Sequence, residues 1–280
     1  MARKKLLGAS VLLGCVAAGG VITAASARAT GGAKPFAVTS SLDGKKVLPQ
    51  YSHWLAHPNV GPAQVAEVDY LIDGKRRWVE HGSPYNYAGD DEHGHLGYLF
   101  TSWLTPGQHR FTVVAVTAAG KKASDTVIAR VLSASAPPAA LAGTWTRTMT
   151  NQDRQKCDPA FGAPDNCAPA GHWRMIIDKV GIWNEDPLHG GIVTAYSVSG
   201  NVLHGYAPIQ MVPNKEDGSP GQIRAHGYTL DAGGGIDCNE AGPFTNYRWS
   251  TSGNELTLKA LDRNCGQQRA IWEGTWTRVG

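Results

Sequence analysis

The pentapeptide GTWTR occurs twice in this chain, at Gly143–Arg147 and again at Gly274–Arg278. Residues 148–273 lie between the two copies, and they contain many short segments in which apolar and polar residues alternate. Such alternation predicts strands that bury one face. A closed antiparallel barrel pairs its first strand with its last, because closure removes the exposed edges of the sheet. We therefore expect the two copies to form the first and last strands of a barrel that spans residues 141–280.

Eight segments of this half have the alternation and length expected of barrel strands. They are Thr144–Thr150, Trp173–Asp178, Ile192–Val198, Val202–Ile209, Gln222–Tyr228, Thr245–Ser250, Glu255–Ala260 and Thr275–Val279. Eight strands make a small antiparallel barrel, just wide enough to hold its own side chains or one small ligand. A short turn of helix is expected between Asp262 and Glu273, before the last strand.

The N-terminal half, residues 34–132, has the strand and turn spacing of an all-β sandwich. An alternating segment, Val65–Ile72, leads into Asp73-Gly74 and then into Lys75–Val79. The Asp-Gly pair is a strong signal for a tight type I′ hairpin. Further strands are expected at Tyr98–Leu104, His109–Val116 and Ala123–Val131. The fold class that we predict for the whole chain is all-β, with a sandwich followed by a barrel.

The first 29 residues have the pattern of a secretory signal peptide. A basic start is followed by an apolar, glycine-containing stretch and by a small-residue site that ends at Ala29. We expect cleavage after Ala29 and a secreted, extracellular product. The alternative is a cell-surface lipoprotein, because Leu12-Leu13-Gly14-Cys15 is similar to the site at which bacterial lipoproteins are acylated. A membrane attachment is expected only if Cys15 is acylated.

The charge balance limits the classes of binding partner, and one segment has the composition of a linker between domains. Removing residues 1–29 takes away four basic residues and no acidic one, which leaves 22 basic against 23 acidic residues. A nearly neutral chain argues against a nucleic-acid partner, which would require a clustered positive face. The segment 133–140, SASAPPAA, has the composition of a semi-stiff linker between two domains.

The cysteines indicate disulfide bonds. Four remain after removal of the signal peptide, an even number in an exported chain: Cys157, Cys167, Cys238 and Cys265. Three pairings are possible, and we favour Cys157–Cys167 with Cys238–Cys265 because the first bond would order a loop rich in Pro, Gly and Asp. The spacing does not fit a four-cysteine zinc site.

Two resemblances add to this interpretation. The segments EVDYLIDGKRRW, PYNY and SWLTPGQHRFTVVAVTAAGKKASDTVIARV, within Ala66–Val131, resemble the bacterial immunoglobulin-like modules of exported proteins. Those modules usually act as spacers or as adhesion and carbohydrate-contact units. The second half is similar to the lipocalin-like (calycin) domains of exported bacterial proteins, through its opening Gly143-x-Trp145 and its closing segment RAIWEGTWTR. This resemblance implies that Trp145 and Trp276 are structural residues of barrel closure, with Arg269 lying across the first-strand tryptophan as a cation–π cap.

The aromatic residues of the second half are the main candidates for ligand contact. A cavity with a few polar groups among aromatic side chains is a typical small-molecule site. The candidate ligand-binding residues are Trp173, Trp183, Tyr196, Tyr206, His226, Tyr247 and Arg248. Neighbouring strand residues point to opposite faces, so Tyr247 and Arg248 cannot both face inward, and the pattern leaves open which one does. A packed barrel without a cavity is the alternative.

No residue pattern predicts a catalytic site. Asp90–His95 is a dense polar cluster, but its spacing fits no complete calcium or zinc motif, and we expect a solvated loop without a metal. We expect no cofactor. The expected function is non-catalytic binding, either of a small apolar ligand inside the barrel or of a cell-envelope component. The alternatives are a glycan- or cell-wall-active enzyme, with the sandwich as its carbohydrate-contact module, and a structural adhesion protein.

Overall fold

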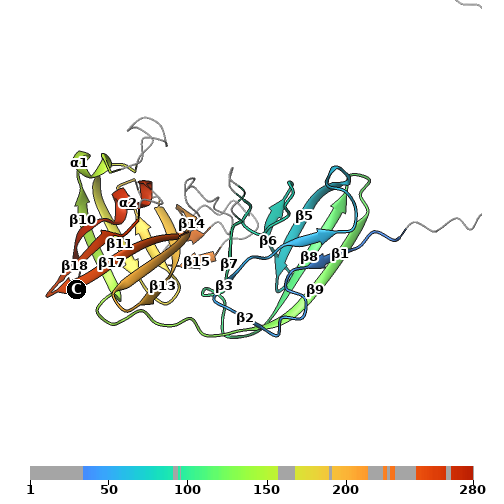
Figure 1. Cartoon of the computed structure of the whole chain (residues 1–280), viewed down its shortest axis with the longest axis horizontal. Coiled ribbons are helices and arrows are strands. Elements are labelled where there is room, and N and C mark those ends of the chain that lie inside the picture. Colours follow the sequence, from blue (N-terminus) through green and yellow to red (C-terminus); the bar gives the residue numbers. More distant parts are fainter. Residues whose placement is uncertain are drawn as a thin grey trace, which may run out of the picture. The chain divides into compact units, whose positions relative to one another are not determined.

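The structure is a computed structural model, and it is all-β with two short α-helices among the residues that it describes (Figure 1). The described residues are 34–90, 94, 96–156, 168–188, 191–213, 223–225, 228–230, 244–262 and 266–279. No strand pairing among them joins the segment before residue 132 to the segment after residue 142. The division at residues 133–140 stays a prediction.

The N-terminal half forms sandwich-like sheets around one core. A five-stranded sheet has the order β2 (Val47–Leu48), β9 (Lys122–Val131), β8 (Gly107–Thr117), β5 (Val65–Ile72), β6 (Lys75–Glu80). Two smaller pairs are β1 (Val38–Ser40) with β4 (Ala56–Pro58), and β3 (Tyr51–Ser52) with β7 (Leu99–Phe100). A one-turn 3-10 helix, η1, covers Pro62–Gln64.

The hairpin predicted at Asp73-Gly74 is confirmed. Asp73 and Gly74 have φ values of 52° and 76°, the positive pair that a type I′ turn requires, and Ile72 pairs with Lys75 across it. The prediction of a strand over Tyr98–Leu104 is wrong in extent. Only Leu99–Phe100 pairs, because the chain turns immediately afterwards with Leu104 N donating to the Thr101 carbonyl.

A buried tryptophan organises the core of this half. Trp54 is fully buried, and the rings of Tyr70, Tyr87 and Phe111 lie 4.9, 5.5 and 5.5 Å from it. Its indole N–H donates to Ser40 Oγ. The tryptophan therefore buries its ring without leaving its one donor unpaired.

A buried histidine joins two turns of the same half. His109 Nδ1 lies 2.6 Å from an Asp73 carboxylate oxygen, and Nε2 lies 2.6 Å from the Thr105 carbonyl oxygen. Both partners accept hydrogen bonds, so the two contacts form together only when both ring nitrogens carry a proton, in the imidazolium form. Burial lowers the pKa of His109, but the hydrogen bonds to Thr105 and Asp73 and the Asp73 charge outweigh it and raise the pKa above its usual value.

The C-terminal half is a closed antiparallel barrel of eight strands. In ring order they are β10 (Gly143–Met149), β11 (Gly171–Ile177), β12 (Ile182–Glu185), β13 (Gly191–Ser199), β14 (Val202–Pro213), β17 (Phe244–Ser252), β18 (Glu255–Ala260) and β19 (Gly274–Val279). Pairing of β13 with β14 and of β10 with β19 completes the ring. The predicted pairing of the two GTWTR segments is therefore confirmed.

One strand of the ring differs from the prediction. The segment Gln222–Tyr228 was expected to be a barrel strand, but its residues fall in β15 (Ile223–Ala225) and the start of β16 (Tyr228–Leu230). These two strands extend the sheet beyond the far end of β14 and lie outside the ring. The eighth ring strand is β12, which the sequence reading did not identify.

Both helices lie at the same end of the barrel (Figure 1). Helix α1 (Asn151–Arg154) follows β10, and α2 (Gly266–Trp272) precedes β19, where a short helical turn was expected. Among the described residues no helix is long and apolar enough to span a membrane.

The two GTWTR copies hold the ring closed by a reciprocal arrangement, here called the clasp. Trp145 lies opposite Arg278 in the β10–β19 register. The Arg278 guanidinium carbon is 4.2 Å from the centre of the Trp145 ring, and that of Arg147 is 5.6 Å from the Trp276 ring. Each copy thus supplies a ring to the arginine of the other copy, in two cation–π contacts.

The arginines of the clasp also bind main-chain carbonyls of the other copy. Arg278 donates to the carbonyls of Ala142 and Ala140, both at 2.8 Å. Arg147 donates to the carbonyls of Glu273 and Ile271. In both cases the acceptors are the carbonyls one and three residues before the glycine of the other copy. The same five residues therefore make the same contacts twice.

The glycines of the clasp are required by this packing. Gly143 and Gly274 have φ values of 130° and 142°, which side-chain-bearing residues rarely adopt. A Cβ atom at Gly143 would lie 2.8 Å from an Arg278 nitrogen, and one at Gly274 would lie 2.8 Å from an Arg147 nitrogen. Each glycine therefore leaves room for the arginine of the other copy.

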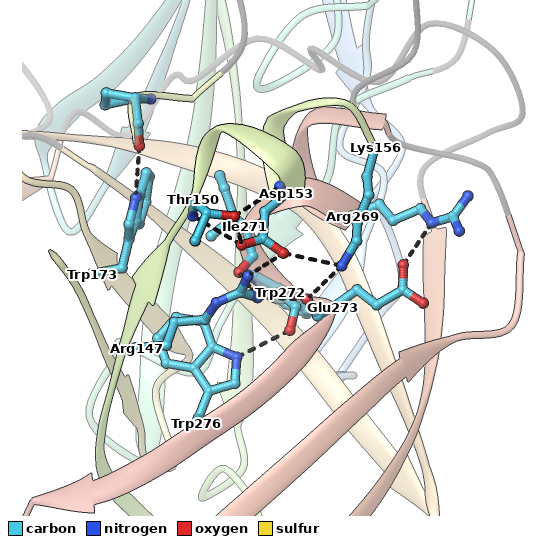
Figure 2. Close-up of polar contacts among 11 residues, drawn as sticks. Arg147, Thr150, Asp153, Lys156, Trp173, Arg269, Ile271, Trp272, Glu273 and Trp276 are labelled. Atoms are coloured by element: carbon cyan, nitrogen blue, oxygen red, sulfur yellow. Dashed lines mark hydrogen bonds and ion pairs between the residues drawn. The ribbon is translucent and has the colours of Figure 1, made fainter. Parts of the chain in front are cut away.

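The two arginines differ in their surroundings. Arg147 is buried, and its Nη2 lies 3.0 Å from Asp153 Oδ1 of α1 (Figure 2). Burial raises the pKa of Asp153, but hydrogen bonds from Thr150 and Lys156 and the charge of Arg147 outweigh it, and the pKa falls to about 2. The contacts of Arg278 are instead with two uncharged carbonyls and with the Trp145 ring.

The role expected of Arg269 is wrong. Arg269 lies on α2, and its Nε pairs with Glu273 at 2.8 Å. The cation over Trp145 is Arg278, because the β10–β19 register places that side chain directly across from the ring. Trp145 and Trp276 are both fully buried in the barrel core, as expected of structural residues.

Arg147→Met should destabilise the barrel more than Arg278→Met. Loss of Arg147 leaves two carbonyls without their donor and removes one cation from Asp153, which is 19% exposed and keeps Thr150 and Lys156 as partners. This loss costs about 2–4 kcal/mol. Loss of Arg278 removes neutral-acceptor hydrogen bonds and a cation–π contact, which costs about 1–3 kcal/mol. Chemical denaturation measures both values, with Arg248→Met, an exposed position on β17, as the control. Equal losses at the two positions would contradict this account.

The stability of the N-terminal half should depend on pH through His109. Its folded-state pKa is raised, so its contribution is complete below the usual value of 6.5 and is lost as the pH rises through the folded value. Thermal unfolding measured across this range should show a falling melting temperature for the natural protein. His109→Gln cannot titrate, and its profile should be flatter over the same interval. Parallel profiles for the two proteins would show that protonation of His109 does not stabilise the fold.

Candidate functional site

Aromatic side chains fill much of the barrel interior. The buried core of the barrel includes Trp145, Trp173, Tyr196, Tyr247, Trp272 and Trp276. Aliphatic residues from β11, β12, β14 and β18 complete it. Several aromatic residues expected to contact a ligand thus belong to the packed core.

The structure brings together three of the predicted ligand-binding residues. Trp173, Tyr196 and Tyr247 are all buried in the barrel interior. Tyr196 donates to the Asp178 carbonyl at 2.6 Å, and the Trp173 indole N–H donates to the Pro169 carbonyl. The face of β17 that the sequence left open is now settled, because Tyr247 and Trp249 both pack on the inside.

Two other predicted residues face away from the interior. Trp183 alternates with Ile182, which belongs to the interior core, so it lies on the outer face of β12, where its N–H donates to Asp178 Oδ1. Arg248 is exposed on the outer face of β17, beside inward-facing Tyr247. Neither side chain therefore belongs to the described barrel interior, and for β17 the inward set is the one that contains Tyr247.

The remaining predicted residues cannot be placed in the site. The backbone of Tyr206 pairs with Phe244, but its side chain lies outside the described part of the structure. His226 and the cysteines Cys157, Cys167, Cys238 and Cys265 also lie outside the described residues. Most of the Asp90–His95 cluster does too, and among the described residues no group of three or more His, Cys, Asp or Glu could hold a metal ion.

A small set of uncharged polar groups lies among the aromatic core. Gln268 of α2 accepts a hydrogen bond from Thr245 Oγ1 at 2.7 Å and donates to Thr194 Oγ1 at 3.4 Å. All three side chains are buried. Helix α2 is therefore tied to the inner faces of β13 and β17, which holds it across one end of the barrel.

Asn184 is the unusual member of the interior. It is two residues after Ile182 on β12, so its side chain shares the inner face with that core residue. Its exposed fraction is 0%, and neither its amide nitrogen nor its amide oxygen has a hydrogen-bond partner. Buried side-chain amides in folded proteins nearly always have partners, in protein or in ordered water. This amide is therefore an exception among the buried polar groups of the barrel.

The strand register places Asn184 toward the helical end of the barrel. Ile182 pairs with Thr194, and two residues further along β12 the backbone of Asn184 pairs with that of Ile192. This step runs toward the end of β13 at which Gly191 lies, the same end at which β10 leads into α1 and α2 leads into β19. Asn184 and the Gln268 cluster thus belong to the same end of the interior.

A second interior donor also lacks a partner. The Trp272 side chain is fully buried, and its indole Nε1 makes no hydrogen bond. Its ring packs over Gly205 of β14, where a Cβ atom would lie 3.1 Å from the ring, and its centre is 5.2 Å from the Tyr247 ring. The absence of a side chain at Gly205 therefore lets the Trp272 ring pack directly on the β14 backbone.

The interior carries little free charge. Among the described barrel residues the buried polar or charged side chains are Arg147, Asn184, Thr194, Thr245 and Gln268. Arg147 is committed to the clasp, and burial raises the pKa of Tyr247, which keeps that phenol neutral. Groups of this kind can position a neutral molecule by hydrogen bonds and apolar contact.

Sequence reasoning missed Asn184, Gln268 and Trp272 as site residues. Asn184 lies in β12, a strand of four residues that was not identified, so the alternation Ile182, Trp183, Asn184 was not read as inward, outward, inward. That alternation was the available signal. The roles of Gln268 and Trp272 depend on where α2 packs, which no local pattern gives.

Comparisons with known proteins give no family. The chain matches no protein-family model and no curated protein sequence. A solved structure of fibronectin(III)-like modules of CbhA from Clostridium thermocellum is similar, with 18% sequence identity and a TM-score of 0.27. The match covers 35% of this chain and 99% of that one. A similarity at this level supports no inference about function.

The Gln268 bridge should behave as one coupled unit. Thr245→Val and Gln268→Met each leave a buried polar group without its partner, and each should cost about 1–3 kcal/mol. The double variant should lose less than the sum, with a coupling of about 1 kcal/mol, because both partners are then absent. Chemical denaturation of the four proteins measures this cycle. Strict additivity would show that the bridge contributes nothing.

Proposed function

We propose that this protein is an exported, non-catalytic binding protein whose barrel holds a small molecule. The observation that carries the proposal is the Asn184 side chain, which is fully buried on the inner wall with both amide atoms unpaired. A ligand that pairs with this amide gives a reason for its presence among the core residues of the barrel.

The energetic argument rests on the cost of such a group. A buried amide without partners costs about 1–3 kcal/mol relative to an apolar residue of the same shape. Natural proteins keep departures from good packing mainly at functional sites. A bound molecule restores the missing hydrogen bonds and stabilises the folded state by mass action.

The surroundings of Asn184 suit a ligand with an apolar body. Met175 lies opposite Asn184 in the register, and Ile182 shares its face. The interior aromatic residues Trp173, Tyr196 and Tyr247 supply further apolar surface. Sites with this composition, mostly apolar with a few polar groups, are typical of small-molecule binding.

Export belongs to the same proposal and rests on the sequence alone. Residues 1–29 have the pattern of a signal peptide, and the linker-like segment 133–140 separates two all-β halves. We assign the sandwich the role of a spacer that presents the barrel outside the cell.

Asn184→Leu should separate stability from binding. In the ligand-free protein the substitution removes an unpaired amide and keeps a similar volume, so the free energy of unfolding should rise by about 1–3 kcal/mol. Native mass spectrometry of the natural protein, purified gently from its own envelope or culture fraction, should show an added mass that disappears on denaturation. The leucine variant, purified in the same way, should lack that mass.

Asn201→Leu is the matched control, since Asn201 is exposed in the turn between β13 and β14. It should retain the added mass and should not gain stability. A natural protein that carries no added mass, together with a leucine variant of lower stability, would contradict the proposed function.

A further inference from the structure

The interior donors and acceptors define the chemistry of the ligand. We infer that the barrel binds an uncharged, carbonyl-bearing molecule of the primary-amide type, with Asn184 and Trp272 as its recognition residues. This inference rests on the proposed function and specifies the polar group that the site selects.

The first argument is the balance of unpaired hydrogen-bonding groups. The Asn184 amide offers two N–H donors and one acceptor oxygen, and the Trp272 indole offers one N–H donor. All of these are buried and unpaired. The missing partner must therefore supply acceptor lone pairs together with at least one donor. A primary amide has a carbonyl oxygen with two lone pairs and its own N–H groups, and it can form a reciprocal pair with the Asn184 amide.

The second argument is the position of the two donors. Trp272 packs on Gly205 of β14, and β14 is two strands from β12 around the ring. The two unpaired donors therefore belong to different elements, the inner face of β12 and helix α2. A compact polar group that lies between these elements can accept from one donor or from both.

The third argument is charge. An anionic ligand would need a cation, but the guanidinium groups of Arg147 and Arg278 are already bound to main-chain carbonyls, and Arg147 also pairs with Asp153. A cationic ligand would need a carboxylate, and the described barrel residues contain no buried Asp or Glu. Burial of an uncompensated charge is strongly unfavourable, so both charged classes should be rejected.

The apolar part of the ligand should lie against the aromatic core. Met175 and Ile182 flank Asn184, and the Trp272 and Tyr247 rings lie close together on the other wall. Binding next to Trp272 should change the tryptophan fluorescence, which gives a direct signal for titration.

The test uses matched probes of three lengths. The full chain is first freed of any carried ligand, and it is then titrated at neutral pH with acetamide, hexanamide and decanamide. The carboxylates of the same lengths (acetate, hexanoate and decanoate) are titrated in parallel. At least one amide should bind at least about tenfold more tightly than its carboxylate, which corresponds to about 1.4 kcal/mol.

Two substitutions assign the recognition to named atoms. Asn184→Leu removes the amide, and Trp272→Phe removes the indole N–H but keeps an aromatic ring. Each should weaken binding of the best amide by about tenfold or more, while Asn201→Leu should leave it unchanged. Circular dichroism and thermal unfolding show whether each variant is folded before it is titrated.

The outcomes distinguish the inference from the proposed function. If a carboxylate binds as tightly as its amide, or if Asn184→Leu binds the amide as well as the natural protein does, the inference fails while the proposed function stands. If no probe binds, the inference fails, and a natural protein that also carries no added mass removes the proposed function as well. Selective amide binding that both substitutions weaken supports the inference.

Discussion

The reciprocal stacking of Arg147 on Trp276 and of Arg278 on Trp145 is the interaction on which the barrel depends. An antiparallel ring of eight strands has one seam at which the two ends of the domain must meet. The clasp is built at that seam from one five-residue sequence used twice. In each copy the glycine leaves space for the arginine of the other copy, and the tryptophan packs in the barrel core. The arginine of each copy donates to main-chain carbonyls that precede the glycine of the other copy. The contacts that close the ring are therefore also contacts of the barrel core.

Closure in this register fixes the rest of the interior. Gly274 belongs to the clasp and follows α2 closely in the chain, so α2 is held at the end of the barrel where β10 leads into α1. In this position Gln268 of α2 bridges Thr194 and Thr245. The same packing seals Asn184 and the Trp272 indole away from water. Buried polar groups that the fold leaves unpaired are a local conflict between sequence and packing. Such conflicts are expected where function outweighs stability.

The repeated pentapeptide predicted the pairing of first and last strands, because a closed barrel must pair them and the two copies flank one strand-rich segment. The cation over Trp145 was expected to be Arg269, but it is Arg278. The choice between these arginines depends on the β10–β19 register and on helix α2, in which Arg269 pairs with Glu273 instead. Strand β12 was missed because four residues give too little alternation, and Asn184 was missed with it. Buried polar groups of this kind are recognised only when their neighbours in space are known.

The most direct measurement is a high-resolution crystal structure of the protein purified from its own source without harsh extraction. The account predicts electron density for a bound organic molecule inside the barrel, with a polar group within hydrogen-bond distance of the Asn184 amide. Density for ordered water alone beside Asn184, in a barrel otherwise filled by its own side chains, would contradict the claim that the interior is a ligand site.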